Sequence, residues 1–163
     1  MKKIFYFVLS LIFLINTVSC TGYKPIFGST EFNIRIVDHA ISGDKRLGNS
    51  IYANLRNSSQ PDSNKNPEIK NIEVFINSSK NKQATAKDTA GKILAYKISL
   101  MTTITIKDYI TNQVIINKVF SYSSSYKVQD QYSETIKLEN RIIDNLVNQT
   151  SKDLLIKLSE ISI

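Results

Sequence analysis

The pattern of apolar and polar residues divides the chain into a leader and a domain. After two lysines, an apolar run extends from Ile4 to Ile15 with only Ser10 interrupting it, and small polar residues follow up to Ser19. A run of about a dozen residues is too short for a membrane-spanning helix, which needs roughly 20, and is typical of a secretory signal. We therefore expect residues 1–19 to be a cleaved signal peptide.

Further along the chain, apolar and polar residues alternate in the way that is typical of half-buried strands. The clearest case is 96–107, where every second residue from Tyr96 to Ile106 lies on one face, and lysine, serine and threonine lie on the other. Shorter runs of the same kind predict strands at 31–38, 71–76 and 114–126. A turn at 108–113 predicts that 96–107 and 114–126 pair as a hairpin. The polar, lysine-bearing stretch from Asn77 to Gly91 is expected to be a connection.

Two segments change to a helical period. Asp44 is expected to cap a helix that continues to about Asn57 and places Leu47, Ile51 and Leu55 on one face. Gly48 lies inside it at a cost of about 1 kcal/mol relative to alanine, so this helix must be stabilised by packing. A second helix of up to about 28 residues is predicted from Ser133, its expected N-cap. Its expected apolar stripe is Ile136, Ile143, Leu146, Val147, Thr150, Leu154, Leu158 and Ile161.

These elements predict an α+β fold, with a four-stranded, mostly antiparallel β-sheet and two helices packed on one face, because an apolar helical stripe must cover another apolar surface. We expect a signal peptide at 1–19, a lipidated N-terminal linker at 20–30 and a single domain at 31–163. The order of the strands and the direction of the first strand are left open by the pattern.

The only cysteine of the chain, Cys20, follows Ser19 where the signal of a bacterial lipoprotein would be cut. In that class the thiol is acylated, which removes an unpaired thiol from an oxidising compartment and holds the protein on a membrane through its lipid. Thr17 stands where such signals usually have leucine, so a lone cysteine that happens to end a signal peptide is the alternative. We expect lipidation of Cys20.

The chain is basic, and its formal charge of +7 falls to +5 once the two leader lysines are removed. Four lysines fall in or beside the predicted connection after residue 77, namely Lys80, Lys82, Lys87 and Lys92. They have two interpretations, as point charges for lipopolysaccharide phosphates or as a solvated loop that keeps the protein soluble. No nucleic-acid partner is expected for an exported lipoprotein.

Catalytic and metal sites are not expected. His39 is the only histidine, and a metal site generally needs three or four ligands of that kind. The chain has no Gly-x-Ser-x-Gly elbow and no phosphate-binding loop. We therefore predict a protein that is not an enzyme and has no cofactor.

Three stretches of the mature chain give it a resemblance to a known family. Gly22-Tyr-Lys-Pro-Ile-Phe-Gly28 is similar to a Gly-aromatic-x-Pro-hydrophobic-aromatic-Gly opening, although Thr21 separates it from the cysteine. Arg46-Leu-Gly-Asn-Ser-Ile-Tyr-Ala-Asn-Leu55 resembles the pattern of a first helix, with Asn49 in place of glutamine. Ser125-Tyr-Lys-Val-Gln-Asp-Gln-Tyr-Ser133 resembles the approach to a last helix. Together they resemble the alphaproteobacterial form of the lipopolysaccharide-assembly lipoprotein LptE.

This resemblance implies an outer-membrane lipoprotein that acts as plug and assembly partner of the β-barrel LptD in lipopolysaccharide transport. It implies the barrel as partner and lipopolysaccharide as a candidate ligand. Tyr109, in the predicted hairpin turn, is then a candidate contact with the barrel wall, since exposed aromatic residues often anchor protein contacts. The competing class is an accessory periplasmic lipoprotein of an ABC-type lipid or solute transporter, and a lipoprotein hydrolase is disfavoured.

Overall fold

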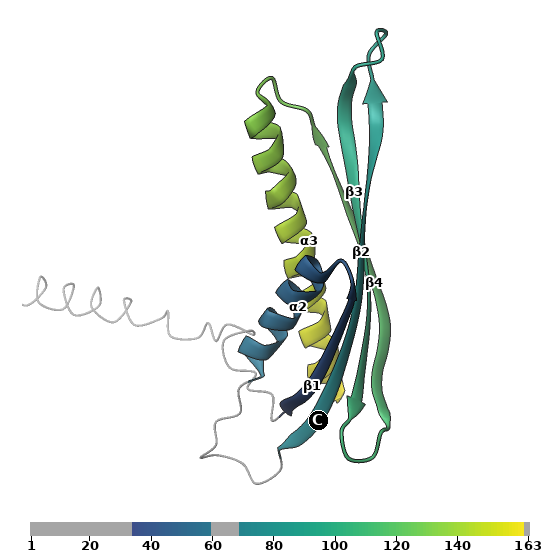
Figure 1. Ribbon diagram of the computed structural model, residues 1–163, viewed down its shortest axis with the longest axis vertical. Coiled ribbons are helices and arrows are strands. Elements are labelled where there is room, and N and C mark those ends of the chain that lie inside the picture. The colour runs from purple at the N-terminus through teal and green to yellow at the C-terminus, as the bar shows by residue number, and fades with distance from the viewer. Residues whose placement is uncertain (1–33, 60–68, 162–163) are drawn as a thin grey trace, which may run out of the picture. The chain divides into compact units, whose positions relative to one another are not determined.

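The computed structural model describes residues 34–59 and 69–161, so Cys20, the predicted signal peptide and the predicted linker lie outside the described residues. The elements follow one another as strand, helix, three strands and helix (Figure 1). Their bounds are β1 (Ile34–Gly43), α2 (Lys45–Ser58), β2 (Lys70–Lys87), β3 (Ile93–Asp108), β4 (Val114–Lys127) and α3 (Tyr132–Ile161).

The four strands form one sheet in the order β1-β2-β3-β4. The pairs β2–β3 and β3–β4 are antiparallel hairpins, which confirms the predicted pairing of the last two strands. Strand β1 runs parallel to β2, from Ile34 beside Lys70 to Gly43 beside Ser78. Parallel neighbours need a crossover connection, and α2 lies in it.

Both helices lie on the same face of the sheet, as Figure 1 shows, and the core fills the space between the two layers. Alternate residues of β2 and β3, such as Val74 and Ile104, point toward the helices and are fully buried. From the helices, Ile51 of α2 and Leu154 of α3 meet them and are equally buried. The predicted α+β fold, with a mostly antiparallel four-stranded sheet covered on one side by two helices, is confirmed.

The predicted connection between Asn77 and Gly91 is wrong, because β2 continues to Lys87. Each residue from Asn77 to Ala84 has a partner on β3, from Thr103 to Tyr96. Serine, asparagine and lysine have low strand propensity, but pairing with a strongly β-forming neighbour outweighs that preference. Only Asp88 to Lys92 remain as the turn between β2 and β3.

The two helices follow their predicted patterns with small shifts. Asp44 is the N-cap of α2, and its carboxylate accepts a hydrogen bond from the backbone N–H of Leu47. Helix α3 begins at Tyr132, so Ser133 lies in its first turn instead of capping it. Most of the predicted stripe of α3 is buried, but Ile161 is 46% exposed at the helix end. Within 34–59 and 69–161, neither helix is long and apolar enough to cross a bilayer.

Candidate functional site

The best-organised polar cluster joins the second half of β2 to α3. The Lys82 ammonium donates to the Glu139 carboxylate over 2.6 Å, and the Tyr126 hydroxyl donates to the same carboxylate oxygen over 2.7 Å. The ammonium also lies 4.3 Å from the centroid of the Tyr96 ring and 5.9 Å from that of Tyr126, within range of a cation–π interaction. We call Lys82, Tyr96, Tyr126 and Glu139 the Lys82 cluster.

The cluster holds its ion pair in the charged form. Burial alone would lower the pKa of Lys82, but its hydrogen bonds to Glu139 and Tyr126 and the charge of Glu139 outweigh burial and raise it. Burial would likewise raise the pKa of Glu139, yet the hydrogen bonds from Lys82 and Tyr126 and the charges of Lys82 and Lys80 lower it. The Lys82 charge is therefore satisfied within the domain and is poorly placed to meet a phosphate.

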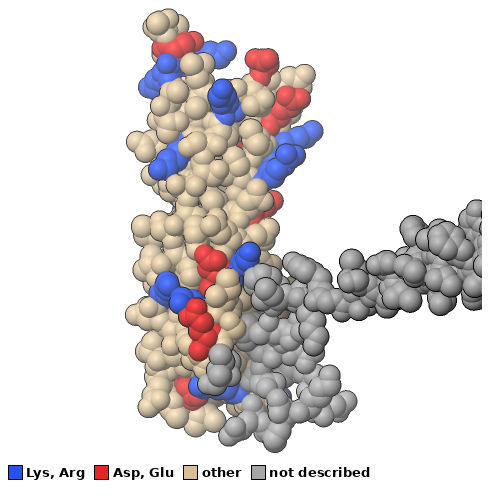
Figure 2. All heavy atoms as spheres, turned by 180° about the vertical axis from the view of Figure 1, so that it is seen from behind, with Lys and Arg blue, Asp and Glu red and all other residues tan. Residues whose placement is uncertain are grey.

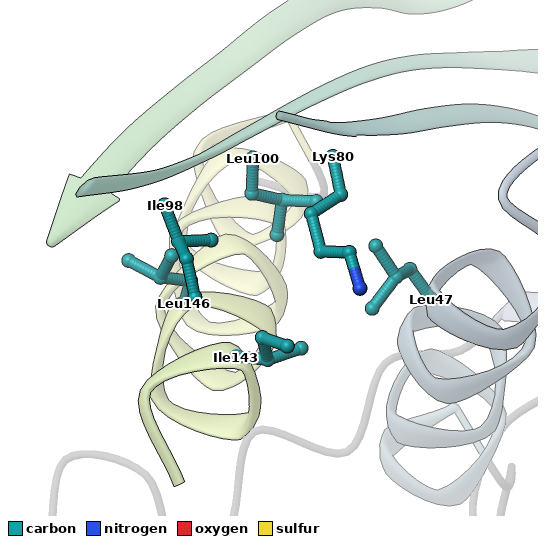
Figure 3. Close-up of a pocket in the computed structure, with 6 residues that line it drawn as sticks. All are labelled: Leu47, Lys80, Ile98, Leu100, Ile143 and Leu146. Carbon is teal, nitrogen blue, oxygen red and sulfur yellow. The ribbon is translucent and has the colours of Figure 1, made fainter. Parts of the chain in front are cut away.

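Lys80 lies on the same side of β2 as Lys82, and among the described residues it has no ion-pair partner within salt-bridge distance. Figure 3 shows its side chain over a small hollow between the sheet and both helices, with the ammonium directed toward α2. The lining residues are Leu47, Lys80, Ile98, Leu100, Ile143 and Leu146. The hollow leaves essentially no space for even a water molecule, so it cannot enclose an acyl chain as it stands.

The other two predicted lysines lie apart from this pair. Lys87 ends β2, and Lys92 belongs to the β2–β3 turn, where its backbone N–H donates to the Asp88 carboxylate. On the face seen in Figure 2, basic and acidic side chains are interspersed and do not form a single basic patch. The structure thus brings Lys80 and Lys82 together and leaves Lys87 and Lys92 at the end of the hairpin. Whether they bind phosphate stays a prediction.

Tyr109 lies in the β3–β4 turn and is 52% exposed. Two neighbours are also exposed, Ile110 of the same turn by 80% and Val114, the first residue of β4, by 56%. The sequence signal for Ile110 was an apolar residue inside a predicted turn, because turns usually carry polar residues, glycine or proline. An interface role for this turn stays a prediction.

Two further side-chain pairs join β4 to α3 and β1 to α2. The Tyr122 hydroxyl of β4 donates to the Asp153 carboxylate of α3, and burial followed by that hydrogen bond raises the pKa of Tyr122 to about 12. His39 is exposed on β1 and stacks on Tyr52 of α2, with 4.0 Å between ring centroids. Residues 34–59 and 69–161 contain no group of three or more histidine, cysteine or carboxylate side chains able to hold a metal ion.

Comparison with known proteins places this architecture. No protein-family profile matches the chain, and no curated protein does. Rare lipoprotein B from Shewanella oneidensis has a similar structure, with a TM-score of 0.52, 11% identity and coverage of 76% of this chain and 94% of that one. A minor lipoprotein from Acinetobacter baumannii has a TM-score of 0.54 at 12% identity, with coverage of 80% of this chain and 91% of that one. Lipoprotein B from Nitrosomonas europaea has a TM-score of 0.55 at 9% identity, with coverage of 78% of this chain and 85% of that one. At these identities the likeness is one of fold, and this chain shares the fold of those bacterial lipoproteins.

Proposed function

We propose that this protein is an outer-membrane lipoprotein of the LptE type, acylated at Cys20, which serves as plug and assembly partner of an LptD-like β-barrel in lipopolysaccharide transport. The observation that carries the proposal is a coincidence of two independent features. A cysteine follows a secretory leader at the lipoprotein position, and the domain after it has the fold of solved structures named as lipoproteins. The periplasmic side of the outer membrane is the proposed location.

The described surface is compatible with a protein that works through contacts. The hollow beside Lys80 is too small for a substrate, and the well-ordered polar groups of the Lys82 cluster bind one another. No enzymatic reaction is therefore part of the proposal. A plug has to present exposed surface to its barrel, and Met101 of β3 and Val119 of β4, 53% and 54% exposed, are apolar residues that can provide some of it.

The test is affinity isolation of the tagged full-length protein from detergent-solubilised membranes. The proposal expects a large outer-membrane β-barrel to be recovered, together with fatty acids on a fragment that begins at Cys20. A Cys20→Ala variant is the matched control, because it keeps the domain and removes the acylation site. Recovery of an inner-membrane permease complex instead would favour the accessory lipoprotein of an ABC-type transporter and would overturn the proposal.

Direct contact with lipopolysaccharide is the finer part of the proposal. Lys80 is its leading cation, because it has no ion-pair partner among the described residues and lies beside apolar side chains. We expect the triple change of Lys80, Lys87 and Lys92 to glutamine to weaken lipopolysaccharide binding, while Lys82 is kept so that the Lys82 cluster stays intact. A variant with three other lysines changed to glutamine, Lys97 on β3 and Lys118 and Lys127 on β4, controls for net charge. Equal lipopolysaccharide binding by both variants would show that these lysines do not recognise lipopolysaccharide directly.

A further inference from the structure

The β3–β4 turn has an unusual surface for a tight turn. Tyr109, Ile110 and Val114 expose 52%, 80% and 56% of their surface, and we call these three residues the apolar turn. The β2–β3 turn at the opposite end of the same hairpin system has the polar or small residues Thr89, Ala90, Gly91 and Lys92, and the nearest exposed large apolar residue is Leu94 of β3, which is 44% exposed. The two ends of one sheet therefore differ in exposed apolar surface, which suggests that they face different surroundings.

Both turns use the same backbone device. Asp88 receives the N–H groups of Ala90 and Lys92 in one, and Asp108 receives those of Ile110 and Thr111 in the other. In the β3–β4 turn, every backbone N–H from residue 108 to residue 113 has an acceptor within the protein. Three of these N–H groups donate to backbone carbonyls: that of Asp108 to Gln113, that of Tyr109 to Asn71 and that of Asn112 to Asp108. The other three donate to side chains: those of Ile110 and Thr111 to the Asp108 carboxylate, and that of Gln113 to the Thr111 hydroxyl.

These hydrogen bonds matter because removing an unpaired backbone N–H group from water costs several kcal/mol of free energy. A turn whose N–H groups are already bonded can enter a water-poor layer and gain the burial of its apolar side chains. The hydrogen bond from Thr111 is the main cause that lowers the pKa of Asp108, with a further contribution from the Lys70 charge, so this carboxylate stays ionised. An ionised group at the base of the turn limits insertion to the headgroup boundary.

The position of the apolar turn follows from the strand register. Ile34, where the described chain begins, pairs with Lys70, and the N–H of Tyr109 bonds to the carbonyl of the next residue, Asn71. The start of β1 and the apolar turn therefore lie at the same end of the sheet, as Figure 1 also shows. Only residues 21–33 separate Cys20 from Ile34, a chain that spans at most about 45 Å when fully extended.

The β2–β3 turn lies at the other end of β3, whose 16 residues span about 50 Å at roughly 3.3 Å per residue. An acyl anchor on Cys20 thus keeps the start of β1, and with it the apolar turn, within about 45 Å of the bilayer, whereas the β2–β3 turn can lie farther away. Attachment through the anchor also makes a weak second contact effective, because it turns that contact into an intramolecular event.

We propose that the apolar turn is a second membrane contact, in which Tyr109, Ile110 and Val114 insert into the headgroup boundary of the phospholipid bilayer that holds the Cys20 acyl chains. The inference rests on the proposed lipidation of Cys20. It orients the sheet with the β3–β4 turn against the membrane and the β2–β3 turn away from it.

The experiment compares one label at two places in the acylated protein. Because Cys20 is blocked by its lipid, Ile110→Cys and Ala90→Cys each supply a single thiol for a polarity-sensitive fluorophore. The proteins are reconstituted into vesicles of phosphatidylethanolamine and phosphatidylglycerol with or without brominated acyl chains. We expect the label at 110 to shift to shorter wavelength and to lose most of its fluorescence to bromine, and the label at 90 to do neither.

Absence of quenching at 110, or equal quenching at both positions, overturns the inference. Shielding of the 110 label that appears only when outer-membrane protein is added would identify a protein contact and would also overturn it. Mass spectrometry of the same samples reads acylation separately. Missing fatty acids on Cys20 would count against the proposed function, whereas an acylated protein with an unquenched 110 label would count against the membrane contact alone.

Discussion

Gly48 of α2 offers a sharp test of how this domain is packed, because two effects on it oppose each other. Replacing a glycine inside a helix with alanine normally stabilises the helix by about 1 kcal/mol. Here, however, the added Cβ would lie well inside van der Waals contact with Cγ2 of Ile41 and 3.7 Å from Cγ2 of Ile76. Ile41 is β-branched and cannot easily turn that methyl group away.

The steric effect should win. Overpacking a well-filled site costs about 1–3 kcal/mol, which exceeds the gain in helix propensity, so we expect Gly48→Ala to lower the free energy of unfolding by about 1 kcal/mol. The clash is specific to one methyl group, and Ile41→Ala removes it. In that background Gly48→Ala should become neutral or stabilising by up to about 1 kcal/mol.

The assay is urea unfolding of the purified mature protein, followed by circular dichroism, for the four members of this double-mutant cycle. Comparable slopes with urea would show that the midpoints report stability. The reasoning is refuted if Gly48→Ala stabilises the parent and the Ile41→Ala variant by the same amount. That result would mean that β1 and α2 separate easily at this contact, and that the glycine is only a weak point of the helix.

Two further changes follow from single contacts. The pKa of Tyr122 is raised from 10.0 to about 12, so the protonated phenol favours the folded state. The stabilisation that it contributes is complete below about pH 10 and is lost as the pH rises toward 12. Tyr122→Phe should flatten the fall in unfolding free energy across that window, measured by urea unfolding at successive pH values. Gly43 has a φ of 72° and its added Cβ would collide with the Ser78 carbonyl oxygen, so Gly43→Ala should destabilise the protein by about 2 kcal/mol or more, with a lower urea midpoint than a Ser42→Ala control.

Local pattern was sufficient to predict the elements whose burial repeats regularly. The alternation from Tyr96 to Ile106 gave the helix-facing side of β3, and the stripe around Leu146 and Leu154 gave the buried side of α3. Tyr126, in the predicted strand 114–126, is buried, and its hydroxyl donates to Glu139 of α3. Each of these assignments needs only the period of the element and one covering layer.

Pairing between distant segments was beyond the reach of the pattern. The parallel pairing of β1 with β2 depends on the crossover through α2, and the length of β2 depends on β3, which supplies partners for serine and lysine residues with little strand propensity of their own. The Lys82 cluster combines both difficulties, since Lys82 and Glu139 are 57 residues apart in the chain. Their contact requires the register of β2 and the rotation of α3 at once.

The same cluster explains how the two halves of α3 should differ in stability. From Ile142 to Leu158 the helix contributes a series of buried residues to the core, whereas between Tyr132 and Arg141 the buried position is Thr135. The first half is held by the partly buried Leu138, by the hydrogen bond of Thr135 with the backbone N–H of Gln129, and by the hydrogen bonds of Glu139 with Lys82 and Tyr126. The hydrogen bonds of Glu139 are partly exposed and are worth about 1 kcal/mol together. We expect Glu139→Gln to speed amide hydrogen exchange between residues 136 and 142 and to leave residues 146–158 unchanged, because the first half can open while the core stays closed. Asp144→Asn, an exposed change further along the helix, is the control. A uniform rise along α3, or none, would show that the helix opens as one unit and that the Lys82 cluster does not set its local stability.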